Sequence, residues 1–220
     1  MSALIWGYVH ILLLVFWVGT DVGVFLCANV ARTTKYKLET RNALFSVLGD
    51  IDLLPRFCFA LIFPSGLTLI DAVGLYAVPL WALMAAWIAG GVWVIAIWKA
   101  HFNPKAAFVG PFRFIQFWGQ GIFGSCLVAG GIASLISGQP VAEKWLAAKI
   151  LLLGLIAFIA MLMTVVSKPF DAAYTEINVS GSTPELETAA SKSMGQTLAV
   201  VLCLYGVLLI TAFIGKVKPF

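Results

Sequence analysis

Charged residues are scarce in this chain. Asp, Glu, Lys and Arg make up only 11% of its 220 residues, whereas a soluble domain carries about a quarter. Hydrophobic residues make up 61%, and the mean hydropathy is +0.99. This composition excludes a soluble globular domain, a disordered chain and a small secreted module held together by disulfides. It is typical of a polytopic membrane protein.

Sequence motifs for hydrolytic and zinc chemistry are also missing. The sequence has no Walker loop, no HExxH motif and no GxSxG motif. The four cysteines stand singly in separate apolar runs, at Cys27, Cys58, Cys126 and Cys203. Without a CxxC or CxxCH motif, they indicate neither a zinc site nor covalently attached c-type haem. The net charge of +4 is not accompanied by a basic patch with aromatic residues, so nucleic acid is not an expected partner.

Six long apolar runs follow one another along the sequence. They cover residues 3–28, 56–75, 79–98, 113–137, 144–167 and 190–215, within a few residues at each end. The runs are continuously apolar rather than alternating, which indicates helices that satisfy their own backbone hydrogen bonds in lipid. The predicted fold class is therefore all-α. It is a polytopic integral membrane bundle of about six transmembrane helices, forming a single transmembrane domain over residues 1–220.

The basic residues between the runs predict how the helices are oriented. Ten of them fall on one side of the membrane: Arg32, Lys35, Lys37, Arg41, Arg56, Lys99, Lys105, Arg113, Lys168 and Lys192. Only three fall on the other side: Lys144, Lys216 and Lys218. By the positive-inside rule, both termini lie outside. The expected location is the cell inner membrane, crossed several times.

Two segments on the predicted inner side have patterns of their own. Apolar side chains in residues 38–49 recur at helical spacing, at Leu38, Leu44, Phe45 and Leu48. Glu39 and Arg41 fall on the opposite face, and both an interfacial amphipathic helix and a solvated loop fit this pattern. Further along, Ser182 and Glu185 have the spacing of a capping box that encloses a proline. We therefore expect the last helix to begin near Pro184, before it enters the membrane.

Ionisable residues inside the apolar runs are candidates for function, because a charge at the bilayer centre costs at least about 2.5–3.5 kcal/mol. The first run contains His10 and Asp21, and both share one helical face with Trp17. This face is expected to point into the bundle. Gly19 and Gly23 form a GxxxG spacing, which predicts close approach of another helix.

His10 and Lys149 are predicted at nearly the same depth. Each lies about five or six residues inside the outer end of its helix, which corresponds to roughly 7–10 Å. Two bases at one depth make a poor ion pair, but as neutral bases both can donate a lone pair to a metal. A haem iron with His10 and Lys149 as its two axial ligands explains why both bases lie at this depth. Trp17 is then a pocket wall, and Asp71, at a shallower level, completes the predicted cofactor-binding residues.

The same residues also allow purely structural interpretations. His10 can be a hydrogen-bonded packing residue, and Lys149 can extend its stem toward the interface. On the inner side, we expect Asp21, Arg56 and Arg113 to form a buried charge cluster that fixes the helices, with a proton relay as the alternative.

Three segments resemble the HemJ and CopD-like membrane proteins. VHILLLVFWVGTDVGVFL is similar to their opening helix, in which His precedes Trp-x-Gly. The segment RFIQFWGQGIFGSCLVAGGIASLISGQPVAEKWLAAKILLLGLIAF is similar to their next hairpin, which ends in Trp-Leu-x-Ala-Lys. ELETAASKSMGQTLAVVLCLYGVLLITAF is similar to their closing helix. The three segments cover about two-thirds of the chain.

The resemblance implies haem b. Members of the HemJ branch bind haem b and oxidise protoporphyrinogen IX, and the motif histidine and lysine are associated with both properties. By motif position these residues are His10 and Lys149. The chain departs from the HemJ pattern by an extra hairpin at residues 56–98, and Ala147 stands where that pattern has a histidine. These departures favour a haem-binding relative of the HemJ proteins over an enzyme that itself oxidises protoporphyrinogen IX.

The sequence therefore predicts a haem-b-binding integral membrane redox protein. Oxidoreductase activity is compatible with this prediction. One alternative is a non-catalytic subunit of a respiratory or other membrane complex. Another is CopD-like copper transport, with Met161 and Met163 among the soft ligands. Expected partners are the lipid bilayer and either other membrane subunits or further copies of the chain.

Overall fold

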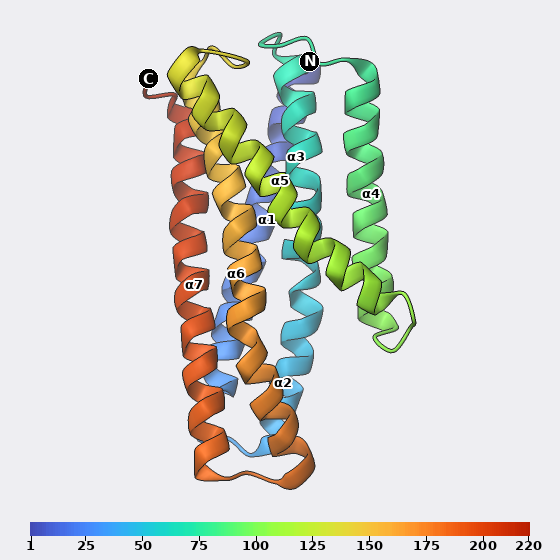
Figure 1. Cartoon of the computed structure of the whole chain (residues 1–220), viewed down its shortest axis with the longest axis vertical. Coiled ribbons are helices and arrows are strands. Elements are labelled where there is room, and N and C mark those ends of the chain that lie inside the picture. The colour runs from blue at the N-terminus through green and yellow to red at the C-terminus, as the bar shows by residue number, and fades with distance from the viewer. The chain divides into compact units, whose positions relative to one another are not determined.

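The computed structural model describes residues 1–220 and contains seven helices and no strands (Figure 1). The helices are α1 (Ser2–Ala31), α2 (Leu38–Ile51), α3 (Leu53–Ala72), α4 (Leu80–Phe102), α5 (Val109–Ser137), α6 (Lys144–Ser180) and α7 (Pro184–Val217). Six stretches are long and apolar enough to cross a membrane, with α2 and α3 counted together. The all-α fold with six spanning helices is thus confirmed, and the chain is a multi-pass membrane protein.

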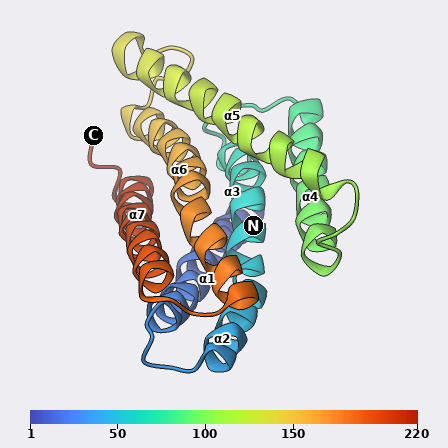
Figure 2. The same ribbon diagram turned by 60° about the horizontal axis from the view of Figure 1, so that its bottom comes forward.

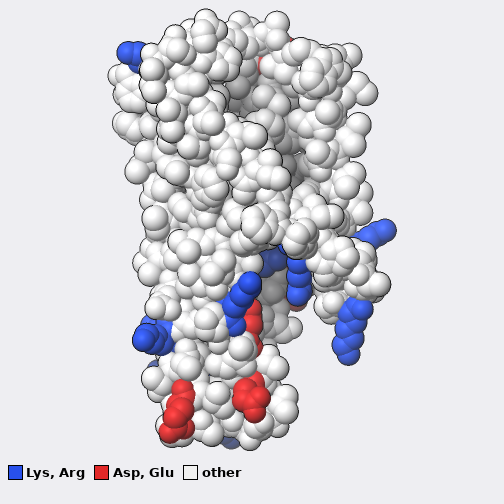
Figure 3. Space-filling model, viewed as in Figure 1, with Lys and Arg blue, Asp and Glu red and all other residues white.

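The chain divides into two compact units. The first contains Met1–Ala31 and Glu39–Val109, which hold α1 to α4. The second contains the connection Arg32–Leu38 and Gly110–Phe220, which hold α5 to α7. Most of the surface drawn in Figure 3 belongs to residues without a charged side chain. Uncharged surface of this kind is what lipid contact requires.

In the first unit, aromatic rings join α1 to α3 and α4. The ring of Trp17 on α1 lies 5.3 Å from that of Phe59 on α3, and Trp6 lies 5.5 Å from Trp87 on α4. The indole Nε1 of Trp87 also donates a 2.9 Å hydrogen bond to Thr68 Oγ1 on α3. Half-buried polar groups in an apolar helix pair thus find partners on the neighbouring helix.

The GxxxG spacing on α1 does not mark a close helix contact. A methyl group at Gly19 would meet nothing within 4 Å, and one at Gly23 would lie 3.9 Å from Ile51 Cγ2, an ordinary van der Waals distance. The expectation of close approach at this motif was wrong. Contacts between α1 and α3 are found elsewhere on α1, at Trp17 against Phe59 and at His10 against Ser65.

Residues 38–51 form a helix, which settles the choice between helix and loop, but the expected faces need correction. Arg41 was expected on the polar face, whereas it is buried with 2% of its surface exposed. Its Nε donates a 2.8 Å hydrogen bond to the carbonyl of Ala31, the last residue of α1. A carbonyl at a helix end has no partner within its own helix, so the guanidinium supplies one. Leu44, Phe45 and Leu48 are half-buried, as the apolar spacing predicted.

In the second unit, α6 and α7 lie side by side in antiparallel directions (Figures 1 and 2). The buried residues of α7 recur every three or four positions, at Leu198, Val201, Leu204 and Leu208. The hydroxyl of Ser193 on α7 donates a 3.0 Å hydrogen bond to the carbonyl of Val166 on α6. This bond places residue 193 level with residue 166.

Glycines allow α5 to cross α6 with the two backbones in contact. A methyl group at Gly131 on α5 would lie 2.7 Å from Leu151 Cβ and 2.8 Å from Leu151 N. One at Gly154 on α6 would lie 2.7 Å from the carbonyl oxygen of Gly124. Neither has space in the present arrangement, so the crossing depends on the absence of a side chain at both positions. Residues 119–124 match the GxGxxG pattern, but they lie inside α5 with no strand before them, so they form no dinucleotide-binding turn.

Helix α6 runs to Ser180 rather than ending near residue 167. It passes Pro169 and continues because Phe170, Ala173 and Ile177 are buried at helical spacing. The first turns of α7 contribute buried residues of their own, among them Ala190. A hydropathy scale detects the part of a helix that lies in lipid, whereas this extension is supported by packing between helices.

The last helix begins at Pro184, as expected, but its cap is one residue later than the capping-box spacing indicated. Thr183 is the N-cap, and its Oγ1 accepts a 3.3 Å hydrogen bond from the backbone N–H of Leu186. Ser182 donates instead to Glu187 Oε1 at 2.8 Å.

Replacing Thr183 with alanine is expected to cost about 1 kcal/mol, because the first turn of α7 loses its cap. Amide hydrogen exchange across residues 185–188 should become faster in this variant. The control is Thr188→Ala, which removes a hydroxyl that only donates to the Pro184 carbonyl within the same helix. Equal exchange rates in the two variants would contradict the capping role.

Candidate functional site

His10 lies on α1 with its ring against α3. Its Nδ1 is 2.9 Å from the hydroxyl oxygen of Ser65, a side chain with no exposed surface. The next residue is Gly66, where a methyl group would lie 3.3 Å from His10 Cε1. The imidazole thus fits against a serine and a residue without a side chain. A larger residue at position 66 would press on the ring.

The hydrogen bonds of Ser65 favour one of the two neutral tautomers of His10. A serine hydroxyl has one hydrogen, and Ser65 donates it to the carbonyl of Ile62 at 2.9 Å. The serine oxygen therefore accepts from His10, and Nδ1 is the donor. In a neutral imidazole the lone pair is then on Nε2. A histidine that binds a metal through Nε2 usually has its other nitrogen hydrogen-bonded in this manner.

Two further residues of the predicted α1 face are buried. Trp17 has 5% of its surface exposed and Asp21 has 6%. Their burial agrees with the expectation that this face points into the protein. Trp17 packs against Phe59, so its ring forms part of the apolar contact between α1 and α3.

Lys149 lies on α6, in the second unit, and its amine is placed by α7. A methyl group at Gly215 would lie 2.8 Å from Lys149 Nζ and 3.3 Å from its Cδ and Cε. The amine thus reaches the last turn of α7, where the partial negative charge of a helix C-terminus favours a cation. Nearby, Lys218 Nζ lies 4.6 Å from the ring centre of Trp145. His10 and Lys149 belong to different units, and their pairing on one iron stays a prediction from the sequence.

Asp71 is not a buried residue. It is exposed, and its Oδ1 accepts a 3.0 Å hydrogen bond from the backbone N–H of Val78. The predicted helix extended to residue 75, which placed Asp71 too deep, whereas α3 ends at Ala72. Its visible role is therefore to hold the connection between α3 and α4.

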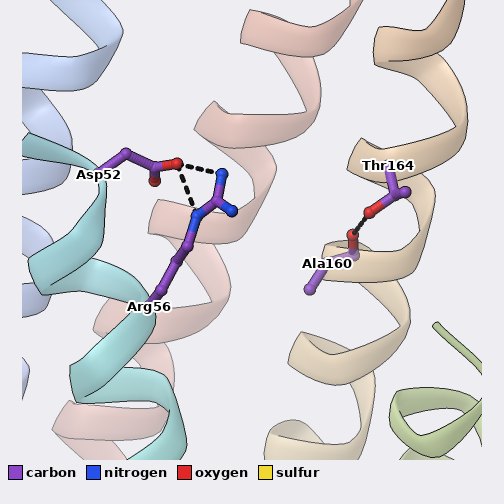
Figure 4. A network of polar contacts seen from close by, with 4 residues as sticks. All are labelled: Asp52, Arg56, Ala160 and Thr164. Atoms are coloured by element: carbon purple, nitrogen blue, oxygen red, sulfur yellow. Dashed lines mark hydrogen bonds and ion pairs between the residues drawn. The ribbon is translucent and has the colours of Figure 1, made fainter. Parts of the chain in front are cut away.

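The expected charge cluster needs a similar correction. Asp21 is buried, but Arg56 and Arg113 are both exposed. The Nε of Arg56 donates a 2.7 Å hydrogen bond to Asp52 Oδ2, one turn earlier on the chain (Figure 4). Arg113 is close enough to Asp171 for their charges to interact. Both arginines thus have carboxylate partners near the surface, and they are not members of a buried cluster.

Copper transport would require soft ligands that converge on the ion. No group of three or more His, Cys, Asp or Glu side chains is arranged to hold a metal ion. Cys126 and Cys203 are exposed free thiols, and the Met161 thioether packs against Gly121 on α5. A haem site needs fewer ligands from the protein than such a metal cluster, because the protein supplies only one or two axial ligands to the iron.

Three residues that place these side chains were not identified from the sequence. They are Ser65 and Gly66, which contact His10, and Gly215, which admits the Lys149 amine. Pro64, Ser65 and Gly66 interrupt an apolar run, and this interruption was the available signal. No comparable signal exists for Gly215, since glycines are frequent throughout the apolar segments.

The site is therefore a single imidazole on α1, hydrogen-bonded to a buried serine, with an aromatic ring further along the same helical face. No family model matches this chain, and no curated protein or solved structure matches it. The likeness to HemJ and CopD-like proteins rests on the sequence motifs given above.

Proposed function

We propose that this protein is a haem-b-binding membrane protein with a redox function, located in the inner membrane. His10 is the axial ligand of the iron in this proposal. The observation that supports it is the 2.9 Å hydrogen bond between His10 Nδ1 and the buried Ser65. Because the Ser65 hydroxyl donates to Ile62, this arrangement favours a lone pair on Nε2, an atom through which histidine binds metal ions.

The surroundings of His10 also suit a haem. Gly66 leaves space for the ring, and Trp17 is an apolar residue on the same helical face. Bound haem would supply reversible one-electron chemistry, and the protein would set its potential through ligation, hydrogen bonding and burial. Ser65 holds the ring orientation, and the apolar side chains of α1 and α3 keep water away from it. The assignment of Lys149 as the second axial ligand rests on the Trp-Leu-x-Ala-Lys motif.

A visible spectrum of the purified full chain, produced with an ample supply of haem, tests this proposal. We expect a Soret band that shifts when the protein is reduced. Lys149→Met keeps an unbranched side chain but removes the amine, so it should retain haem while its oxidised spectrum changes. A colourless preparation under these conditions would instead support a non-catalytic subunit, in which His10 only packs between helices.

A further inference from the structure

A cleft with several polar side chains lies beside the first turns of α7. Its volume is about 620 Å³, and it is open to the surroundings. It is lined by the connection that follows α1 and by one face of α7: Arg32, Thr33, Thr34, Pro184, Glu187, Thr188, Ser191 and Lys192. All of these residues belong to the second unit.

The charges that line the cleft favour an anion with a single negative charge. Arg32 and Lys192 are positive and Glu187 is negative, so the lining has a net charge of +1. Hydroxyl groups from Thr33, Thr34 and Ser191 add hydrogen-bond donors, whereas the Thr188 hydroxyl donates to the Pro184 carbonyl within α7. A phosphodiester has one negative charge and several acceptor oxygens, which matches this combination of one net positive charge and many donors.

Arg32 is held in the cleft by two successive turns of α7. Its Nη1 donates a 3.4 Å hydrogen bond to the carbonyl of Ser191. One turn later, a methyl group at Gly195 would lie 2.9 Å from the same nitrogen. The guanidinium thus lies against the α7 backbone, in space that the missing side chain of Gly195 leaves open. A fixed guanidinium loses less conformational freedom on binding a phosphate than a mobile one.

The cleft lies at the level where the apolar part of α6 ends. Ser193 bonds to Val166, the last residue before Ser167 and Lys168 interrupt the apolar run of α6. Ser191 and Lys192, which line the cleft, directly precede Ser193. The boundary between the apolar core and water is the depth at which lipid phosphates are found.

We propose that this cleft binds the phosphodiester of an anionic membrane lipid such as phosphatidylglycerol. Arg32 and Lys192 contact the phosphate, and the hydroxyls of the lining contact its remaining oxygens. Glu187 limits the net charge and so disfavours more highly charged phosphates. This site is separate from the proposed haem ligand and does not depend on it.

Native mass spectrometry of the detergent-solubilised full chain, titrated with phosphatidylglycerol, tests the proposal. We expect Arg32→Gln and Lys192→Gln each to weaken lipid binding about fivefold, as is typical for loss of one basic residue near a membrane surface. Gly195→Ala should also weaken it, because it displaces the guanidinium without removing its charge. Glu187→Gln keeps an acceptor for Ser182 and should strengthen binding.

Two controls separate this site from general charge attraction and from free phosphate. Lys168→Gln removes an exposed basic residue outside the cleft and should leave the affinity unchanged. If Lys168→Gln weakens binding as much as Arg32→Gln, the specific cleft is overturned. If millimolar inorganic phosphate displaces the lipid completely, the site binds phosphate from solution and the lipid assignment is overturned. Unchanged lipid affinity in both Arg32→Gln and Lys192→Gln would also overturn the lipid assignment.

Discussion

Gly131→Ala is expected to lower the thermal unfolding temperature of the protein by roughly 5 °C. The added methyl would lie 2.7 to 2.9 Å from Leu151 Cβ, N and Cα, and backbone atoms of a helix cannot move aside singly. The helices must separate at their crossing, and such overpacking costs about 1–3 kcal/mol. For a chain of this length, each kcal/mol corresponds to about 2–4 °C. Heating the detergent-solubilised protein and measuring the fraction that stays monodisperse on size exclusion gives the comparison.

Gly130→Ala is the matched control for this experiment. The neighbouring residue makes the same chemical change on the same helix, but a methyl group there meets nothing within 4 Å. Since alanine is favoured over glycine in a helix by about 0.5–1 kcal/mol, this variant should be unchanged or slightly more stable. Gly154→Ala, on the other side of the crossing, should behave like Gly131→Ala. Equal melting temperatures for the variants at 130 and 131 would show that the backbones are not in contact.

Helix positions could be predicted because the membrane imposes a length on each apolar run. A hydrocarbon core of about 30 Å requires about 20 uncharged residues, and six such runs are present. The parts of helices outside the core obey no such rule. Helix α6 continues to Ser180 through contacts of Phe170 and Ile177, and these are visible only once its neighbour is in place. The same holds for Arg41, whose burial depends on the end of α1.

Prediction of which residues are buried succeeded or failed according to how far each residue stands from a helix end. Asp21 and Trp17 stand well inside an apolar run, and they are buried as expected. Asp71 and Arg56 stand within a turn or two of a helix end, where a shift of a few residues moves a side chain into water. Both are exposed and have local partners. Ser65 could not be assigned a partner from the sequence, because serine in an apolar helix usually bonds to its own backbone.

His10→Ala is expected to remove the haem spectrum completely. The imidazole is the proposed ligand, and neither a methyl group nor the nearby Ser65 hydroxyl can replace its nitrogen at the iron. The measurement is the Soret absorbance per mole of protein, compared with wild type at equal folding yield on size exclusion. Full haem content in this variant would show that another residue binds the iron.

Ser65→Ala separates ligation from packing, because it leaves the imidazole in place and removes only its hydrogen-bond partner. Loss of such an outer partner typically weakens metal binding 10- to 100-fold, so we expect haem to be lost on dilution. The remaining haem should have a higher midpoint potential, because an imidazole without this acceptor is a weaker electron donor to iron. Ser125→Ala is the control, since that hydroxyl is exposed and bonds only to the carbonyl of Gly121 in its own helix. If His10 were purely structural, Ser65→Ala would change the melting temperature and leave the midpoint potential of the haem unchanged. That result would contradict ligation of the iron by His10.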